Sequence, residues 1–390
     1  MSPCLPEIKI KADKISDHPW VYHTALEPIK APISNGSVVD LVGKNDDWLA
    51  RGFYNKHARI AVRVLTRNHD ENIDASFFER KIKAALELRQ NTYLLDRVTN
   101  AYRLIHAEGD GLSGLVVDKY NDLIALEFFS SGMYKFRDII IGCFKSFFPS
   151  SQFYWFAEKK VQKQESFDCH SPQSVSPVII EEHGVKFHVR SGLKHKTGFY
   201  IDQRPNRLYF SQFCEGKRIL DICSFTGGFS LYATTKGKAR EVTAIDLDEE
   251  AIKLAKENAT LNHASINFIQ SDLLQTIPDL ISKKELFDVI ILDPPRLTKA
   301  QDKIDAVLKH YTYMNQQALQ LVAKNGIFVT CSCTGLIKED DFLRALRRAA
   351  FQVNRNLQVF HISGAGEDHP VSIAAPEGRY LKVVWCHLSD

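Results

Sequence analysis

The pattern of apolar and polar residues gives the chain a β-rich beginning. Between residues 37 and 65, three segments rich in β-branched and aromatic residues (SVVDL, WLARGF and IAVRVL) predict short strands separated by turns. A helical pattern follows over residues 74–89, with its apolar positions on one face. Two more strand-like segments lie between residues 115 and 129, and the polar stretch SPQSVSP at 171–177 predicts a linker.

From about Ile219 onward the pattern alternates between strands and helices. The apolar runs RILDIC, EVTAIDLD, INFIQSD, FDVIILD and GIFVTCSC predict strands, and amphipathic segments such as EEAIKLAKENATLN and EDDFLRALRRAA predict helices. This alternation is typical of an α/β fold with a parallel sheet and crossover helices. Ligands of such folds bind beyond the carboxyl ends of the strands, so the chemistry is expected there.

The first predicted strand leads into a tight turn. Asp221 lies near its end, and the turn contains Ser224, Thr226 and Gly227 in the run SFTGGF. Glycine lets a ligand approach the backbone closely, but the G-x-G-x-x-G spacing of a pyrophosphate-binding loop is absent. An acid here suits an ammonium group. We therefore expect Asp221 to bind the ammonium group of S-adenosylmethionine and the other three residues to bind the cofactor beside it.

Acidic residues also follow the next three strands. Asp246 is placed to accept the ribose hydroxyls and Asp272 to accept from the adenine amino group. The fourth strand ends in Asp293, which is also expected at the cofactor site. Each could instead be a helix N-cap, which is a common role for aspartate after a strand. Four consecutive strand ends with aspartate favour a Rossmann-like methyltransferase over a nucleotide-dependent dehydrogenase.

The fourth and fifth strands are expected to be neighbours and to hold the methyl acceptor. Asp293-Pro294-Pro295 makes a rigid turn, because each proline fixes its own φ and restricts the preceding residue. Arg296 follows where adenine N6 methyltransferases usually carry an aromatic residue. This position argues against methylation of adenine.

Cys333 ends the fifth strand, which favours covalent catalysis on cytosine. Attack of its thiolate on C6 would activate C5, with Asp293 assisting at N3. Cys331 points to the same face but lies deeper, so a structural role is expected for it. Two alternatives are that both cysteines are buried apolar residues, or that they bind a metal.

Composition limits the class of protein. The 390 residues suggest two or three domains, and 44% hydrophobic and 25% charged residues are ordinary for a globular protein. No apolar run reaches membrane-spanning length, and the first residues show no signal peptide, so a cytoplasmic protein is expected. Eight cysteines without a CxxC pair indicate reduced thiols and argue against structural zinc.

Nearly the whole chain resembles class I methyltransferases with an N-terminal PUA domain, whose best-known type forms 5-methylcytosine in large-subunit (23S) ribosomal RNA. The motifs that carry the resemblance are HPWV (18–21), YRLIHAEGDGL (102–112), EEHG (181–184), HKTGFYIDQR (195–204), SFTGGF (224–229), DPP (293–295), SCTG (332–335), DHP (368–370) and PEGRYLK (376–382). The resemblance implies a β-barrel-like PUA domain that binds RNA at 1–72, a central α/β domain at 73–178 and the Rossmann-like methyltransferase domain at 179–390.

The resemblance also implies roles for single residues. Tyr200 and Gln203 would help cover the cofactor, and the family's nucleophile matches Cys333. A related branch that methylates guanine at N7 has an asparagine-containing sequence here, so Cys333 favours the cytosine branch. Many RNA cytosine-C5 enzymes carry a second cysteine after the two prolines, where this chain has Arg296. The base that removes the C5 proton is therefore not identified.

Basic residues before the first methyltransferase strand predict an RNA-facing surface. With a net charge of only +3, such a surface has to be local. We expect phosphate or base contacts from Lys194, Lys196 and Arg204, which lie in a stretch that also holds His195 and Arg207, and from Arg296. A solvated basic segment is the alternative.

The expected partner is ribosomal RNA or a ribosomal subunit precursor, and a homodimer is compatible with the sequence. Two other functions remain open. One is a guanine-directed RNA methyltransferase, and the other is a non-catalytic, cofactor-binding assembly factor. Cys333 separates the first from the leading hypothesis, because only a covalent mechanism requires it.

Overall fold

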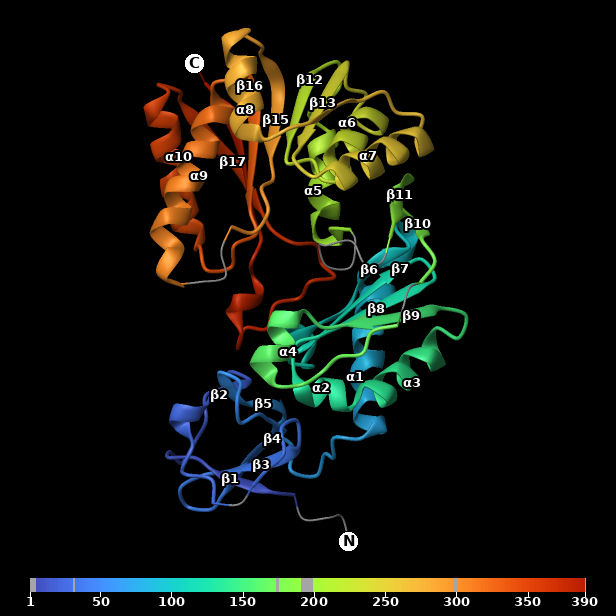
Figure 1. Cartoon of the computed structure of the whole chain (residues 1–390), viewed down its shortest axis with the longest axis vertical. Coiled ribbons are helices and arrows are strands. Elements are labelled where there is room, and N and C mark those ends of the chain that lie inside the picture. The colour runs from blue at the N-terminus through green and yellow to red at the C-terminus, as the bar shows by residue number, and fades with distance from the viewer. Residues whose placement is uncertain (1–4, 31, 173–174, 191–198, 298–300, 390) are drawn as a thin grey trace. The chain divides into compact units, whose positions relative to one another are not determined.

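The computed structural model describes residues 5–30, 32–172, 175–190, 199–297 and 301–389 (Figure 1). The chain forms two compact units. The first unit consists of Met1–Ile180, Val189–Gly198 and Glu367–Gly378, and the second of Glu181–His188, Phe199–Gly366 and Arg379–Asp390. The predicted three-domain division at residues 72 and 178 stays a prediction. No helix in the described ranges has the length and apolar character needed to cross a membrane.

The first unit begins with a five-stranded sheet in the order β1-β3-β4-β5-β2. Its strands are β1 (Glu7–Lys9), β2 (Trp20–Tyr22), β3 (Val38–Val42), β4 (Trp48–Tyr54) and β5 (Ile60–Thr66). β1 pairs with β3 in parallel, and the other pairs are antiparallel. The strands expected between residues 37 and 65 are thus present, and their apolar side chains, such as Val39 and Val62, form a small core.

The rest of the first unit is a four-stranded sheet with helices. The sheet has the order β6-β7-β8-β9, with β6 (Ala101–His106), β7 (Leu115–Tyr120), β8 (Leu123–Phe128) and β9 (Gln152–Phe156). The helices are α1 (Ala75–Glu87), α2 (Ser131–Lys135), α3 (Arg137–Phe147) and α4 (Lys159–Glu165). Asp74 begins α1 by accepting a hydrogen bond from the Phe77 N–H at 3.0 Å. Phe77, with Phe144 of α3, belongs to the core under the sheet.

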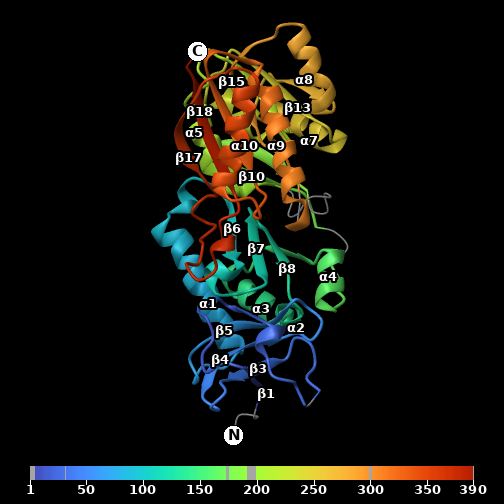
Figure 2. The same ribbon diagram turned by 90° about the vertical axis from the view of Figure 1, so that its left-hand side faces the viewer.

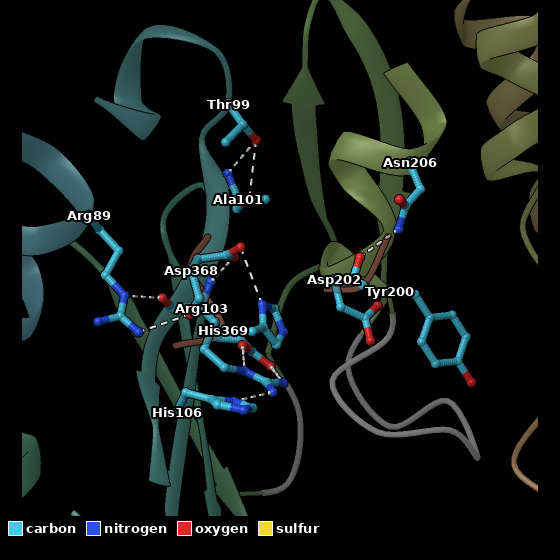
Figure 3. Close-up of polar contacts among 12 residues, drawn as sticks. Arg89, Thr99, Ala101, Arg103, His106, Tyr200, Asp202, Asn206, Asp368 and His369 are labelled. Atoms are coloured by element: carbon cyan, nitrogen blue, oxygen red, sulfur yellow. Dashed lines mark hydrogen bonds and ion pairs between the residues drawn. The ribbon is translucent and has the colours of Figure 1, made fainter. Parts of the chain in front are cut away.

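A segment from the C-terminal part of the chain, Glu367–Gly378, belongs to the first unit. The Asp368 carboxylate accepts from the Arg103 N–H at 2.8 Å, and its carbonyl oxygen accepts from Arg89 Nη2 at 2.9 Å (Figure 3). The rings of His369 and His106 lie 5.0 Å apart. The DHP motif is therefore a buried structural contact within this unit.

A two-stranded hairpin, β10 (Val178–Glu182) and β11 (Val185–Val189), precedes the large sheet of the second unit. That sheet has seven strands in the order β14-β13-β12-β15-β16-β18-β17. They are β12 (Arg218–Ile222), β13 (Glu241–Asp246), β14 (Asn267–Gln270), β15 (Phe287–Leu292), β16 (Val322–Ser332), β17 (Leu357–Ser363) and β18 (Lys382–Leu388). The first five of these are parallel, and β18 runs antiparallel between β16 and β17.

Helices cover both faces of this sheet. They are α5 (Arg204–Ser211), α6 (Gly228–Thr235), α7 (Glu249–Leu261), α8 (Leu273–Ser282), α9 (Ile304–Leu319) and α10 (Glu339–Gln352). The first three lie on one side of the sheet and the last three on the other, as two views show (Figures 1 and 2). Two separate apolar clusters, one on each face, account for the nearly continuous apolar run of β15. The predicted Rossmann-like α/β fold is confirmed.

The strand order fixes where a ligand can bind. β12, the first strand of the sheet, has β13 on one side and β15 on the other, so the direction of winding reverses at β12. In open α/β sheets, ligands bind at the carboxyl ends of the strands beside such a reversal. The prediction that the fourth and fifth strands are neighbours also holds, because β15 and β16 are paired in parallel.

Candidate functional site

Four aspartates lie at or just after the carboxyl ends of four adjacent strands of the large sheet. The order β14-β13-β12-β15 places Asp272, Asp246, Asp221 and Asp293 in a row. This is the order expected if an adenine, a ribose, an amino-acid tail and a methyl acceptor lie along the same edge. The topology therefore brings together acids that are up to 72 residues apart in sequence.

Asp221 is buried at the end of β12, with 1% of its surface exposed. Its Oδ2 accepts hydrogen bonds from the backbone N–H of Ser230 at 3.0 Å and from Ser230 Oγ at 2.6 Å. Its Oδ1 has no partner among the described residues, and neither has the buried Oγ of Ser224. Burial raises the pKa of Asp221 to about 7. An ammonium group would supply the missing donor and favour the ionised carboxylate.

The turn after β12 has an unusual backbone. Cys223 and Phe225 have φ values of 64° and 48°, and Gly227, the N-cap of α6, has 83°. Non-glycine residues rarely adopt this left-handed region, and where they do the surrounding structure has to hold them in place. Here the Ser224 N–H donates to the carbonyl of Ile245 at 3.0 Å. The turn is thereby held against β13.

Asp246 connects this turn to the second strand end. Its Oδ2 accepts from the Phe225 N–H at 2.8 Å, and its Oδ1 from the Asp248 N–H at 2.9 Å. These bonds orient the carboxylate and leave further lone pairs for a ligand. Sequence reasoning missed the Phe225 N–H, because no residue type marks a backbone donor.

Asp272 illustrates the alternative reading of a strand-end aspartate. It is the N-cap of α8, where its Oδ1 accepts from the Leu274 N–H at 2.9 Å. This contact accounts for aspartate at the position without a ligand. The role of Asp272 in binding adenine therefore stays a prediction.

Gln203 links the entry to α5 with the fourth strand end. Its Nε2 donates to Asp293 Oδ2 at 3.0 Å, and its Oε1 accepts from Asn206 Nδ2 at 2.7 Å. Removal from water raises the pKa of Asp293 to about 7, and Asp202 and Asp221 act in the same direction, while the bond from Gln203 opposes them. Asp293 is thus able to carry a proton near neutral pH.

The two cysteines of the fifth strand differ in access. Cys331 is fully buried inside β16, and burial raises the pKa of its thiol well above the ordinary value. Cys333 follows the end of β16 and is partly exposed, with its Sγ 3.9 Å from the carbonyl oxygen of Pro294. Cys333 therefore faces the Asp293-Pro294-Pro295 turn and Cys331 does not reach solvent.

The predicted basic surface is only partly described. Lys194, His195 and Lys196 lie outside the described residues. Arg204 and Arg207 are each 2% exposed, and Arg207 forms an ion pair with Glu182 at 2.6 Å. The expectation that Arg204 contacts phosphate is corrected, because a buried guanidinium does not reach RNA at the surface. Arg296, by contrast, is exposed.

Tyr200 lies beside the turn after β12, with its ring 5.1 Å from that of Phe225. It is close to the expected cofactor site, as Gln203 is. The neighbouring Asp202 accepts a hydrogen bond from the hydroxyl of Tyr380. This bond ties the segment before α5 to the segment before β18, a contact that sequence reasoning did not foresee.

Comparison with known proteins decides the family. Residues 11–67 match the model of a PUA-like domain, and residues 155–359 match that of an S-adenosylmethionine-dependent methyltransferase. The chain is 36% identical to ribosomal RNA large subunit methyltransferase I of Aeromonas salmonicida over 94% of both chains. It is 32% identical to the Escherichia coli protein of the same name over 95% of both chains. The chain belongs to the ribosomal RNA large subunit methyltransferase I family.

Two solved structures resemble this chain over nearly its whole length. A SAM-dependent methyltransferase from Streptococcus mutans superposes with a TM-score of 0.80, 19% sequence identity and coverage of 98% of this chain and 100% of the other. A methyltransferase crystallised with SAH gives a TM-score of 0.83 at the same identity and coverage. The fold is that of a class I methyltransferase with an N-terminal PUA-like domain.

This protein is an S-adenosylmethionine-dependent methyltransferase. The residues predicted to form its cofactor site fit that molecule. The unpartnered Oδ1 of Asp221 and Oγ of Ser224 suit the cofactor's amino-acid end, and the carboxylate of Asp246 suits ribose hydroxyls.

Proposed function

We propose that this protein methylates C5 of a cytosine in large-subunit ribosomal RNA, with Cys333 as the covalent nucleophile. The observation that carries the proposal is the partly exposed Cys333 thiol facing the Asp293-Pro294-Pro295 turn, beside an aspartate that can hold a proton. The relatives named as ribosomal RNA large subunit methyltransferases support the substrate.

The proposed reaction uses the chain's own groups in sequence. The Cys333 thiolate forms a bond to C6 while the electrons of the C5–C6 double bond move toward C5, and Asp293 donates a proton or hydrogen bond to N3. S-adenosylmethionine supplies an electrophilic methyl group. After the methyl is transferred, a base takes the C5 proton, the double bond forms again and the thiolate leaves.

The pKa of Asp293 supports its part in this reaction. An aspartate with an ordinary pKa would be ionised at neutral pH and could only accept a hydrogen bond at N3. Burial and the neighbouring acids Asp202 and Asp221 raise the pKa to about 7, so a sizeable fraction is protonated. A protonated carboxyl can donate to N3 and withdraw electron density from the ring.

Cofactor binding is proposed for the other predicted site residues, three of which belong to the row of aspartates. Asp221, Ser224, Thr226 and Gly227 would hold the amino-acid end, Asp246 the ribose and Asp272 the adenine, with Tyr200 and Gln203 beside them. The contacts that support this are the unpartnered Asp221 Oδ1 and the anchored Asp246 carboxylate. Arg296 is proposed to contact RNA, since it is exposed and follows the proline turn.

Nucleoside analysis of methylated RNA tests the proposed function. Large-subunit RNA from a strain lacking the gene is incubated with the purified protein and labelled S-adenosylmethionine, then digested to nucleosides. We expect label in 5-methylcytidine. Label in a methylguanosine would establish the guanine-directed alternative, and no label with either naked RNA or subunit precursors would favour an assembly factor.

A further inference from the structure

Lys382 is a buried lysine that has no role in the proposed reaction. It is the first residue of β18, where its backbone pairs with Ser332 at the end of β16. Only 3% of its surface is exposed. Lysine is almost never buried so completely unless it is paired, because its charge loses hydration.

The ammonium of Lys382 is held by the turn that follows Cys333. Its Nζ donates to the carbonyl oxygen of Thr334 at 2.9 Å and to that of Ile337 at 2.8 Å. Both acceptors lie between the end of β16 and the start of α10. One side chain therefore closes the turn whose first residue is the proposed nucleophile.

Thr334 extends this contact to the opposite wall of the site. Its Oγ1 lies 3.0 Å from the hydroxyl of Tyr311 in α9 and accepts from the Leu297 N–H at 3.4 Å. Leu297 comes shortly after the two prolines of the Asp293 turn. Lys382 thus acts on a residue that joins the Cys333 turn to the Asp293 turn.

The charge of Lys382 also acts on Cys333. Burial lowers the pKa of Lys382 to about 8, and the attraction between its ammonium and the Cys333 thiolate opposes this effect. Tyr200, Tyr311 and Cys331 also interact electrostatically with Cys333. Around Lys382 itself, Arg296 and Arg379 disfavour its charge and Glu339 favours it.

We propose that Lys382 is a positioning residue for Cys333, whose buried ammonium fixes the turn that presents the thiol and favours the thiolate. The thiolate is the reactive form of cysteine, and a neighbouring cation increases its fraction at a given pH. The proposal rests on the proposed role of Cys333 as nucleophile. It gives a family motif, YLK at 380–382, a physical purpose.

The test is the pH dependence of Cys333 alkylation in the full-length protein. Iodoacetamide labelling is read by mass spectrometry on the peptide of residues 325–338, whose fragment ions separate Cys333 from the buried Cys331. Lys382→Met is expected to move the midpoint of labelling upward by about one pH unit. Tyr311→Phe removes an uncharged contact to the same threonine, so it should lower turnover and leave the midpoint in place. The exposed Lys338→Met, read on the longer peptide of residues 325–344 because the substitution removes a cleavage site, is the charge-matched control and should change neither.

Two outcomes overturn the proposal. One is an unshifted midpoint in a folded Lys382→Met protein. The other outcome applies if the Lys382→Met protein does not fold. Lys382→Arg keeps a cation at this position, so a labelling midpoint raised above the wild-type value in that variant would contradict the electrostatic role. Failure of the proposed function would look different, because the midpoint would still shift in Lys382→Met while 5-fluorocytosine RNA traps no adduct on the wild-type protein.

Discussion

Gln203 Nε2 donates a hydrogen bond to Oδ2 of Asp293 at 3.0 Å, which joins the segment before α5 to the end of β15. The same amide nitrogen lies 3.6 Å from Cys331 Sγ. A single buried amide therefore connects the predicted cofactor cover, the predicted acid and the inner cysteine. Substitution of Gln203 should therefore disturb the proposed site while all four aspartates of the row remain in the sequence.

Gln203→Leu is expected to lower turnover by roughly tenfold to a hundredfold, because a hydrogen bond to a charged group contributes about 1.5–3 kcal/mol. The loss of the donor should also raise the pKa of Asp293 further, since that bond now favours the ionised form. The measurement is single-turnover methylation across pH. Asn206→Leu, which removes the support of Gln203 but not the bond to Asp293, is the control and should have a smaller effect. Equal effects of the two variants would contradict this reading.

Asp246→Ala should weaken S-adenosylmethionine binding by roughly tenfold to a hundredfold, from the loss of about 1.5–3 kcal/mol of hydrogen bonds to a charged group. Isothermal titration calorimetry measures the effect. The matched control is Asp248→Ala, because Asp248 caps α7 and accepts from the N–H groups of Glu250 and Ala251. That variant should lose about 1 kcal/mol of stability and keep its affinity. Unchanged affinity in a folded Asp246→Ala protein would place the ribose contact elsewhere.

Cofactor binding should release protons near pH 7. Asp221 has a pKa raised to about 7, so it is partly protonated in the free protein. The ammonium group of the cofactor favours the ionised form of Asp221, and affinity should therefore increase from about pH 6 to about pH 7.5. Calorimetry in buffers of different ionisation enthalpy counts the protons, and Asp221→Asn should release fewer. Binding that takes up protons would contradict the placement of the cofactor's ammonium beside Asp221.

The same shifts have a consequence for stability, with a definite sign. The native state holds protons on Asp221 and Asp293 at pH values where the unfolded chain, with a pKa near 3.8, has released them. The contribution of these two groups to the free energy of unfolding therefore decreases as pH rises from about 4 through about 7. Comparing the wild-type protein with Asp221→Asn by urea denaturation across this range isolates the contribution of Asp221. The difference between the two proteins should change with pH in that direction, and a constant difference would contradict the raised pKa.

Arg207→Leu should destabilise the protein by about 3–5 kcal/mol, because it leaves the buried Glu182 carboxylate unpaired. The ion pair has a bidentate geometry, with Arg207 Nε and Nη2 donating to the two Glu182 oxygens at 2.6 and 2.9 Å. The double variant Arg207→Leu with Glu182→Leu should recover most of this loss. Denaturant unfolding measures both. A variant that loses RNA affinity but keeps its stability would restore the basic-surface role that burial argues against.

The row of four aspartates could be predicted from sequence because each follows an apolar run of strand length. The alternation of strands and helices then placed all four at one edge of a parallel sheet. Sequence could not separate a ligand-binding aspartate from a helix cap, and Asp272 is an N-cap in the structure. That distinction depends on which N–H lies within reach, which residue types do not reveal.

Other parts of the structure depend on contacts between distant residues. In the sequence, Arg207 belongs to a basic stretch, and nothing nearby shows that it is paired. Its partner Glu182 lies 25 residues earlier, in β10. The contacts of Lys382 with Thr334 and Ile337 span 48 and 45 residues, and the return of Asp368 to Arg103 spans 265. Periodicity and local motifs carry no signal for such pairs.

The most direct test of the central proposal is covalent trapping on Cys333. Large-subunit RNA carrying 5-fluorocytosine at the target should form a stable adduct with the wild-type protein and S-adenosylmethionine, because fluorine cannot leave as a proton does. Cys333→Ser should abolish both trapping and methylation, since a hydroxyl is a far weaker nucleophile than a thiolate. Cys331→Ser is the matched control: it should keep the chemistry and lose only stability, by burying a hydroxyl. Peptide mass spectrometry that finds the RNA on Cys333 confirms the account, whereas trapping on Cys331, or full methylation by Cys333→Ser, would contradict it.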